Sequence, residues 1–376
     1  MAELQRLSGS QLRLNEALPW DVYDVSGQLL LRKGYVVQRN EQIDILLERG
    51  MFVDSLEFDA HRATYESAAV RKVYDPHAVW QAIQAQLNSL LISLPGDGSF
   101  EHEVQNLARH VILLCERFPD LAIAAILLKE YKRYPIAHSV HCAVLCALIS
   151  RRGDFDEASR ISLCAAALTA NAAMIEPQQL FLHQKTPITP QQLALIRAHP
   201  EEGVKLLMAA GVNDKEWLRA VLEHHELEDG SGYPRQVKTP SLSAMIIHTS
   251  DVFTALLSPR ADRKPLVPSE AAKRVYLQLG HGKENPFPGL LVKELGMYPP
   301  GALVKLANGE VGVVCKRGEQ TGTPIVATLI NVKGLQQLDP VRRDTASSPQ
   351  FKIVSLMPRE STMVPINFEQ IWSRKS

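Results

Sequence analysis

The chain has 376 residues, of which 45% are hydrophobic and 22% charged, as is ordinary for a soluble globular protein of two or three domains. Lys and Arg together number 41 and so do Asp and Glu, so the net charge of zero excludes the strongly basic balance of a dedicated nucleic-acid-binding protein. The N-terminus lacks the apolar block of a signal peptide, and no apolar stretch approaches the roughly 18 residues of a membrane span. We expect a cytoplasmic protein without a nucleic-acid or membrane partner.

The N-terminal 60 residues have the pattern of a small α+β module. Residues 19–38, "PWDVYDVSGQLLLRKGYVVQ", contain short β-prone runs around an Asp-Val-Ser-Gly turn. Residues 40–54, "NEQIDILLERGMFVD", predict a short helix, a stop at Gly50 and a strand. Residues 61–100 follow as a helical connector, which ends in the Pro- and Gly-containing loop "SLPGDGSF".

The middle of the chain, residues 101–297, predicts an all-helical domain. Its apolar residues recur at intervals of three and four. The predicted helices span 101–117, 119–131, 137–151, 156–174, 189–210, 214–227, 241–257 and 268–279. The fold class is therefore mainly α, a helical bundle with a small module at each end.

Residues 298–376 predict a small β-rich domain. Two β-prone runs, "ALVKLANGEVGVVCKRG" and "TPIVATLINV", carry this prediction, and the first of them contains an Asn-Gly turn. We expect Glu310 and Lys316 in this domain to be ordinary surface charges.

The five cysteines do not have the paired spacing of a metal or disulfide framework. Four of them lie in apolar helical stretches, where free cysteine packs as a small hydrophobic residue. We therefore expect reduced, structural cysteines at the following positions: Cys115, Cys142, Cys146, Cys164 and Cys315.

Histidines and one aspartate on separate predicted helices are the candidate metal ligands. Helical bundles build metal sites from such side chains, which converge from several helices. A structural or capping role stays open for each of them from spacing alone. The candidates are His138, His199, the adjacent pair His224 and His225 in "EHHELEDGSGYP", and Asp251.

These motifs, in this order, resemble the HD-GYP domains, a branch of the HD metal-dependent phosphohydrolases. The matching segments are "HS" at 138, "HPEEG" at 199, "HHE" at 224, "DGSGYP" at 229 and "SDVFTALLSPR" at 250. The resemblance covers roughly residues 101–297 and implies an HD-type helical bundle. It also implies hydrolysis of cyclic di-GMP at two or three iron or manganese ions.

The Gly-Tyr-Pro loop has two interpretations. The resemblance implies contacts with substrate and with signalling proteins, through Asp229, Gly230, Gly232, Tyr233 and Pro234. The backbone requirements of a tight turn also explain its two glycines and its proline without any ligand.

One segment departs from the family pattern. Where the family has Leu-His-Asp-Ile-Gly-Lys, this chain has "LTANAAM" at 168–174. Ala170 thus stands in place of a ligand histidine, Asn171 in place of the metal-bridging aspartate, and Met174 in place of a phosphate-facing lysine. Tyr134 occupies the position of the glutamate that serves a third metal. We therefore assign no catalytic residue.

The departure limits the expected metal content. A neutral amide does not supply the charge and the two oxygens of a bridging carboxylate, so only His138 and Asp251 remain for the first metal. The three imidazoles of His199, His224 and His225 can hold zinc, iron or manganese. We expect at most one bound transition metal per chain, and the sequence also allows a chain that binds no metal. Glu176 and Glu202 are the nearest acidic residues that can fill the vacated position.

Nucleotide binding can persist without the metals, because arginine recognises phosphate by its own geometry. The resemblance suggests Arg260 and Arg263 for this role, with Tyr233 and Arg235 from the loop. A solvated basic turn is the alternative for the two arginines at 260 and 263.

Three functions follow as hypotheses. The first is a degenerate HD-GYP module that binds cyclic di-GMP or docks onto signalling partners, with little or no phosphodiesterase activity. The second is an enzyme, either a metal-dependent cyclic di-GMP phosphodiesterase or a mononuclear-metal phosphohydrolase. The third is a scaffold without a ligand. The sequence predicts no oligomeric state.

Overall fold

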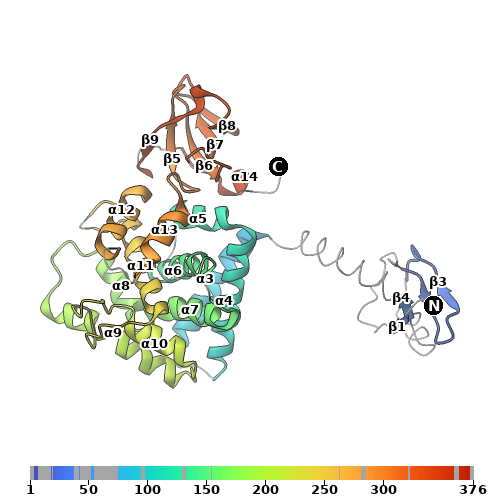
Figure 1. Ribbon diagram of the computed structural model, residues 1–376, viewed down its shortest axis with the longest axis horizontal. Coiled ribbons are helices and arrows are strands. Elements are labelled where there is room, and N and C mark those ends of the chain that lie inside the picture. Colours follow the sequence, from blue (N-terminus) through green and yellow to red (C-terminus); the bar gives the residue numbers. More distant parts are fainter. Residues whose placement is uncertain are drawn as a thin grey trace. The chain divides into compact units, whose positions relative to one another are not determined.

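The computed structural model divides into two compact units, Met1–Asp75 and Pro76–Ser376 (Figure 1). It describes residues 4–6, 18, 20–37, 42, 52–54, 75–94, 98–128, 133–153, 155–261, 263–280, 285–320, 322–359 and 364–372. The predicted helix after residue 40, apart from Gln42, and residues 61–74 of the predicted connector lie outside these ranges.

The first unit contains a small antiparallel sheet in the order β1-β4-β2-β3. Its strands are β1 (Leu4–Arg6), β2 (Val22–Tyr23), β3 (Leu29–Leu31) and β4 (Phe52–Asp54). The predicted Asp-Val-Ser-Gly turn joins β2 to β3, and the Asp24 carboxylate accepts hydrogen bonds from the backbone amides of Ser26 and Gln28 at 2.8 and 2.9 Å. Leu18, Trp20, Val22, Val37 and Val53 form the apolar core of this unit.

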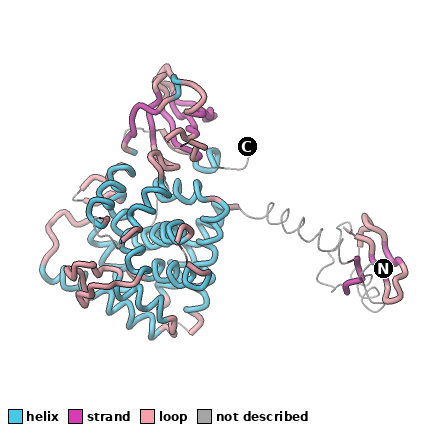
Figure 2. Tube along the Cα trace, viewed as in Figure 1, coloured by secondary structure: helices cyan, strands magenta, loops and turns pink. Residues whose placement is uncertain are grey.

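The second unit is mainly helical, as Figure 2 shows. Its helices are α3 (Pro76–Ile92), α4 (Phe100–Arg117), α5 (Pro119–Leu128), α6 (Tyr134–Ser150), α7 (Glu157–Thr169), the short 3₁₀ turn η2 (Ala172–Met174), α8 (Ile175–Leu182), α9 (Pro190–Ala209), α10 (Lys215–Glu223), α11 (Leu242–Leu257), α12 (Pro268–Leu279) and α13 (Phe287–Leu295). The predicted fold class, mainly α with a small module at each end, is confirmed.

Helix α6 is the centre of the helical part. All of its residues are buried, and it packs against α3, α4, α5, α7, α8, α11 and α13. Helix α3 belongs to this body rather than to a connector, because Trp80, Ile83 and Leu87 are buried where it packs on α4 and α6. A helix that is apolar on every side, as α6 is, has to lie inside a bundle.

The helical segments differ from the prediction at two places in the chain. The predicted helix 156–174 ends at Thr169, and η2 and α8 follow it directly. Helix α13 occupies a region where no helix was predicted. The early end of α7 matters for the site, because Ala170 and Asn171 thereby lie at a helix end instead of within a helix.

The chain ends in a five-stranded antiparallel sheet with the order β8-β7-β6-β5-β9. Its strands are β5 (Leu303–Leu306), β6 (Val311–Lys316), β7 (Ile325–Ile330), β8 (Gln336–Asp344) and β9 (Ile353–Met357), with η3 (Pro349–Phe351) and α14 (Phe368–Trp372) beside them. The two predicted β-prone runs form β5, β6 and β7. The edge strand β8 was not predicted, because its polar sequence QQLDPVRRD lacks the alternation of a half-buried strand.

The expected surface role of Glu310 is wrong. Its side chain is 3% exposed, and its carboxylate accepts two hydrogen bonds from the Arg343 guanidinium at 2.9 and 3.0 Å. Asn308 donates a third at 2.9 Å. A buried carboxylate is tolerated here because it is paired and fully hydrogen-bonded. Lys316 is exposed, as expected.

The β domain is joined to the helical body by close packing and by ion pairs. Gly301 has φ +92°, and a Cβ there would lie 2.9 Å from the Cα of Ala124 in α5, so only glycine fits. Arg317 contacts Asp120 of α5 at 2.5 Å and donates to the backbone carbonyl of Glu294 in α13 at 3.2 Å. These contacts fix the domain on one end of the bundle.

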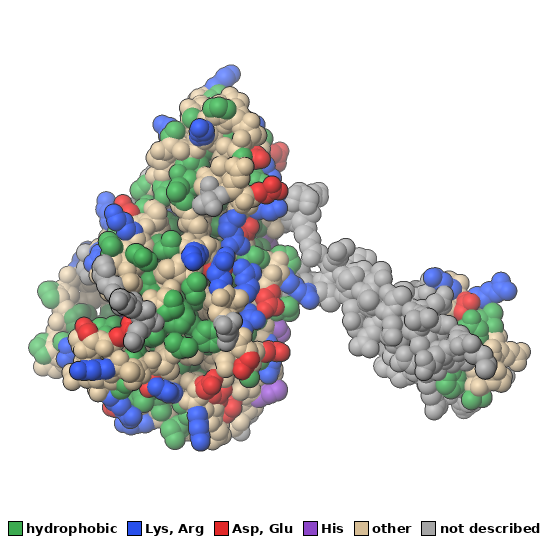
Figure 3. Space-filling model, viewed as in Figure 1, with side chains coloured by type: hydrophobic (Ala, Val, Ile, Leu, Met, Phe, Trp, Pro, Cys, Tyr) green, Lys and Arg blue, Asp and Glu red, His purple; other side chains and the backbone are tan. Residues whose placement is uncertain are grey.

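The surface charge and the apolar helices bear on contacts with nucleic acids and membranes. The face shown in Figure 3 carries both signs of charge, and neither sign covers it alone. Among the described residues, one segment, Glu157–Leu182, is long and apolar enough to cross a membrane, and 72% of its most apolar window is buried inside the protein. The core helices of soluble proteins meet the same criterion, so this is weak evidence for a span.

Candidate metal centre

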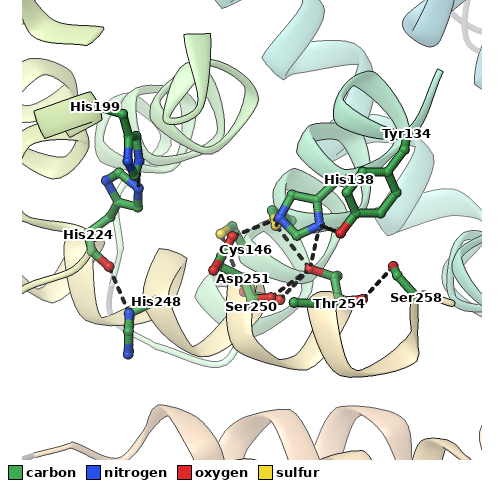
Figure 4. Close-up of polar contacts among 12 residues, drawn as sticks. Tyr134, His138, Cys146, His199, His224, His248, Ser250, Asp251, Thr254 and Ser258 are labelled. Carbon is green, nitrogen blue, oxygen red and sulfur yellow. Dashed lines mark hydrogen bonds and ion pairs between the residues drawn. The ribbon is translucent and has the colours of Figure 1, made fainter. Parts of the chain in front are cut away.

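The helical body brings the predicted ligands together as two groups. His199 from α9 and the adjacent His224 and His225 after α10 form the first, with ligand atoms within 4.8 Å of one another. His138 from α6 and Asp251 from α11 belong to the second, which also includes Cys142. Figure 4 shows the imidazoles of His199 and His224 close together. His138 and Asp251 lie beside each other, apart from that pair.

The tautomers of His199 and His224 are fixed by their own helices. Nδ1 of His199 lies 2.6 Å from the carbonyl oxygen of Ile196, and Nδ1 of His224 lies 2.6 Å from that of Val221. A carbonyl only accepts, so each Nδ1 donates its proton and each Nε2 presents a lone pair. The two Nε2 atoms face each other at 3.1 Å.

Burial keeps these imidazoles uncharged. It lowers the pKa of His224 to about 3, and it also lowers the pKa of His199 and, strongly, that of His225. All three rings are therefore neutral at pH 7, the form in which imidazole binds metals. Two neutral nitrogen lone pairs facing each other across 3.1 Å repel unless a cation lies between them.

The third histidine is oriented by the Gly-Tyr-Pro loop. The ring of Tyr233 stacks on His225 with the centroids 4.7 Å apart, and the backbone amide of Tyr233 donates to the carbonyl of His225 at 3.1 Å. The loop folds back tightly at Gly232, where a Cβ would lie 2.4 Å from the backbone nitrogen of Leu227. Gly230 has φ +75°, which also favours glycine.

A buried carboxylate that the sequence analysis did not single out holds this loop. Glu226 accepts hydrogen bonds from the backbone amides of Arg235 at 2.6 Å and Val237 at 3.0 Å. Asp229 is exposed and accepts from the backbone and hydroxyl of Ser231, as in an Asx turn. Glu226 follows directly after the two histidines in "HHE", which was the available signal.

The second group is arranged as an ion pair. Nε2 of His138 lies 2.7 Å from Oδ1 of Asp251, and the Cys142 sulfur lies 3.7 Å from the same Nε2. Burial alone lowers the pKa of His138, but the contacts with Cys142 and Asp251 outweigh it and raise that pKa to about 10. Burial alone raises the pKa of Asp251, whereas His138 holds it well below its usual range.

A cavity of about 400 Å³ lies beside both groups. Its lining includes His138, Asn171, Met174, His199, His225, Tyr233, Asp251, Arg260, Lys185 and Tyr134. Asn171 and Met174 thus face the same space as the candidate ligands, in the positions that the resemblance assigns to the aspartate and the lysine. Ala170 is buried and offers no ligand atom.

The four candidate nucleotide-binding residues do not share one position. Tyr233 and Arg260 line the cavity. Arg235 is exposed and lies 3.5 Å from Glu201, and Arg263 donates to the carbonyl of Ala255 at 2.5 Å, so neither belongs to the cavity wall.

Neither acidic residue fills the vacated ligand position. The Glu176 side chain is 74% exposed and pairs with Arg133, and Glu202 is 55% exposed and pairs with Lys205. The structure places Cys142 beside His138 instead. The sequence analysis treated Cys142 as a packing residue, although its spacing of four from His138 puts both side chains on one face of α6.

The helical part of the chain is similar to known proteins. The model of the HD domain family matches residues 123–283. "Cyclic di-GMP phosphodiesterase PA4108" of Pseudomonas aeruginosa is 29% identical over 262 residues, which are 68% of this chain and 63% of that protein. "3'3'-cGAMP-specific phosphodiesterase 3" of Vibrio cholerae is 27% identical over 266 residues, 67% of this chain and 57% of that protein. The chain thus matches less than two thirds of the length of each.

Among solved structures, "Bd1817, a HDG"Y"P protein from Bdellovibrio bacteriovorus" aligns with a TM-score of 0.51 at 16% identity, over 77% of this chain and 99% of that one. At this identity the likeness shows a shared fold. The family match thus shows an HD domain at residues 123–283, and the motifs at 138, 199, 224, 229 and 250 follow the HD-GYP pattern within it.

Proposed function

We propose that this protein is a regulatory HD-GYP module that binds one transition metal through His199, His224 and His225 and binds a cyclic dinucleotide in the adjoining cavity, with little or no hydrolysis. The observation that carries the proposal is the 3.1 Å separation of the His199 and His224 Nε2 atoms, whose lone pairs point at each other. Two imidazole nitrogens on one zinc ion lie about 2.9–3.4 Å apart, given bonds of about 2.0–2.1 Å. The donor set therefore fits a metal.

The chain's own residues prepare this site for a cation. The carbonyls of Ile196 and Val221 fix the tautomers, burial keeps the rings neutral, and Tyr233 holds His225 by stacking. Outer hydrogen bonds of this kind orient metal ligands, and losing one typically lowers metal affinity by about 10–100-fold. A bound metal would supply Lewis acidity towards a phosphate oxygen or a water.

The composition of the cavity supports nucleotide binding. Arg260 and Lys185 lie in its wall and can pair with phosphate oxygens, and Tyr233 offers a ring beside them. Both named relatives carry the words cyclic di-GMP or cGAMP in their names, which makes a cyclic dinucleotide the first ligand to test.

The same wall supports weak or absent hydrolysis. Asn171 faces the cavity where a bridging carboxylate would be needed, and Met174 supplies no positive charge. In two-metal phosphodiester cleavage both ions stabilise the charge that develops on the phosphate. Each electrostatic contribution of this size is typically worth roughly 3 kcal/mol or more, so losing two lowers the rate by on the order of 10⁵.

Calorimetric titration with cyclic di-GMP, with and without added zinc or manganese, tests the binding part. We expect saturable binding in wild type, and weaker binding in Arg260→Ala than in the matched control Arg235→Ala, whose side chain lies outside the cavity. Equal loss in both variants, or no binding in wild type, would contradict the assignment of this cavity.

Product analysis by chromatography tests the hydrolysis part. Linear dinucleotide or mononucleotide formed at ordinary enzymatic rates would replace the regulatory function by the alternative, a metal-dependent phosphodiesterase. The relatives' names favour that alternative, and it requires the His199, His224 and His225 site as well.

A further inference from the structure

Cys142 lies beside His138 and Asp251. Its sulfur is 3.7 Å from Nε2 of His138, and its ligand atom, that of His138 and that of Asp251 are all within 4.8 Å of one another. Sulfur and imidazole ligands on one tetrahedral zinc ion lie about 3.6 Å apart, given bonds of about 2.3 and 2.0–2.1 Å. The cysteine is therefore already at the separation that a shared ion requires.

Hydrogen bonds with Thr254 orient the His138 ring and the Cys142 side chain beside Asp251. The Thr254 hydroxyl donates to the backbone carbonyls of Ser250 and Asp251, at 2.9 and 3.0 Å. It can then only accept from Nδ1 of His138 and from the Cys142 thiol, both at 3.3 Å. Nε2 is left as the ring nitrogen that faces Asp251 and the sulfur.

The charges of these groups also balance a divalent ion. Nε2 of His138 lies 2.7 Å from Oδ1 of Asp251. A divalent ion at this point would be held by a neutral imidazole, a carboxylate and a thiolate, and the thiol proton would leave to solvent. The two negative ligands cancel the two positive charges, which a buried site needs.

We propose that Cys142 replaces the ligand lost at Ala170, and that His138, Cys142 and Asp251 form a second, thiolate-containing metal site that prefers a soft ion such as zinc. It revises the expectation of at most one metal per chain. A thiolate also supplies the negative charge that Asn171 does not. The inference deepens the proposed function, because both groups adjoin one cavity, but it makes a separate prediction about sulfur coordination.

Cobalt(II), which takes tetrahedral sites much as zinc does, reports this coordination by absorption spectroscopy. Metal-free wild type is titrated with cobalt under a phosphine reductant, beside Cys142→Ser and the matched control Cys146→Ser. Cys146 lies one turn further along the same helix, is equally buried, and contacts the Ser250 hydroxyl at 3.6 Å instead of the site. Circular dichroism verifies that each variant is folded, and Cys142→Ala substitutes for a serine variant that does not fold.

In wild type we expect a near-ultraviolet sulfur-to-cobalt charge-transfer band together with the weaker visible bands of the histidine site. Cys142→Ser loses the charge-transfer band and falls from about two to about one bound ion per chain, whereas Cys146→Ser keeps both. In His199→Ala the charge-transfer band persists, because the second site uses other ligands.

The inference about Cys142 is overturned if wild type shows the visible bands alone, or if the charge-transfer band survives in Cys142→Ser. The first of these outcomes leaves the proposed histidine site standing. Absence of every cobalt band in wild type contradicts both the inference and the proposed function.

Discussion

The Nε2 atoms of His199 and His224 face each other at 3.1 Å, while each Nδ1 donates to a backbone carbonyl three residues before it. Two neutral nitrogen lone pairs repel at this distance, and a cation between them would remove the repulsion. The pair therefore marks the place where binding energy is available to a cation, and binding there should stabilise the folded chain.

Removing one of these imidazoles should reduce the stabilisation of the folded chain by zinc. Saturating zinc stabilises wild type by about 2.7 kcal/mol at a hundredfold excess over Kd, because the unfolded chain lacks the assembled site. His224→Ala should lose the increment that comes from the histidine site, and the exposed His183→Ala should keep it. Thermal unfolding with and without zinc measures the difference. An equal zinc response in His224→Ala and wild type would show that the metal binds elsewhere.

Restoring the family residues at positions 170 and 171 should change both the metal content and the stability of the chain. Asn171→Asp places a carboxylate on the cavity wall, so we expect a higher metal content in elemental analysis. Ala170→His introduces a large ring at a position that is 1% exposed, which overpacks the core at a cost of about 1–3 kcal/mol. Urea unfolding separates the two effects. A folded double variant that binds metal no more tightly than the parent would show that residues 170 and 171 do not reach the ligand groups.

The Gly-Tyr-Pro loop should depend on Glu226. In Glu226→Gln one of the two oxygens that accept from the amides of Arg235 and Val237 becomes a donor, and one backbone amide loses its partner. We expect a loss of about 1–3 kcal/mol in the free energy of unfolding and weaker zinc binding, since Tyr233 no longer holds His225 as firmly. The control is Glu216→Gln, at an exposed position on α10. Equal stability of the two variants would contradict a supporting role for Glu226.

Glu310 gives a prediction about pH. The Arg343 hydrogen bonds hold the pKa of the Glu310 carboxyl below its ordinary value of 4.5. Its contribution to stability is therefore complete above about pH 4.5 and is lost as the pH falls through the lower, folded-state value. Urea unfolding at several pH values should show Glu310→Gln less stable than wild type near neutrality by about 1–2 kcal/mol. The gap should close in acid, and a gap that stays constant with pH would exclude this explanation.

Much of the helical part could be predicted because its signals are local. Amphipathic periodicity, the Thr189 capping box and the Pro residues near helix starts set most boundaries of α4–α12. The edge strand β8 could not be predicted in the same way, since it is held by pairing with β7 and has few buried side chains. Such a strand forms because of its contacts with the rest of the fold, which the local sequence does not reveal.

The site likewise contains residues that the sequence identified and residues that it did not. The five candidate ligands were identifiable from motif order, and the structure brings His199, His224 and His225 into one group and His138 and Asp251 into another. Cys142 was not singled out, because its neighbours Asp251 and Thr254 lie more than a hundred residues away in sequence. The burial of Glu310 was missed for the same reason, since its partner Arg343 lies on another strand.

The most direct test of the histidine site is anomalous X-ray scattering from crystals of wild-type protein grown with excess zinc, measured on both sides of the zinc edge. The account predicts a zinc peak within bonding distance, about 2.0–2.1 Å, of the ring nitrogens of His199, His224 and His225. No zinc peak among these three side chains, with the His199 and His224 rings turned apart, would contradict it.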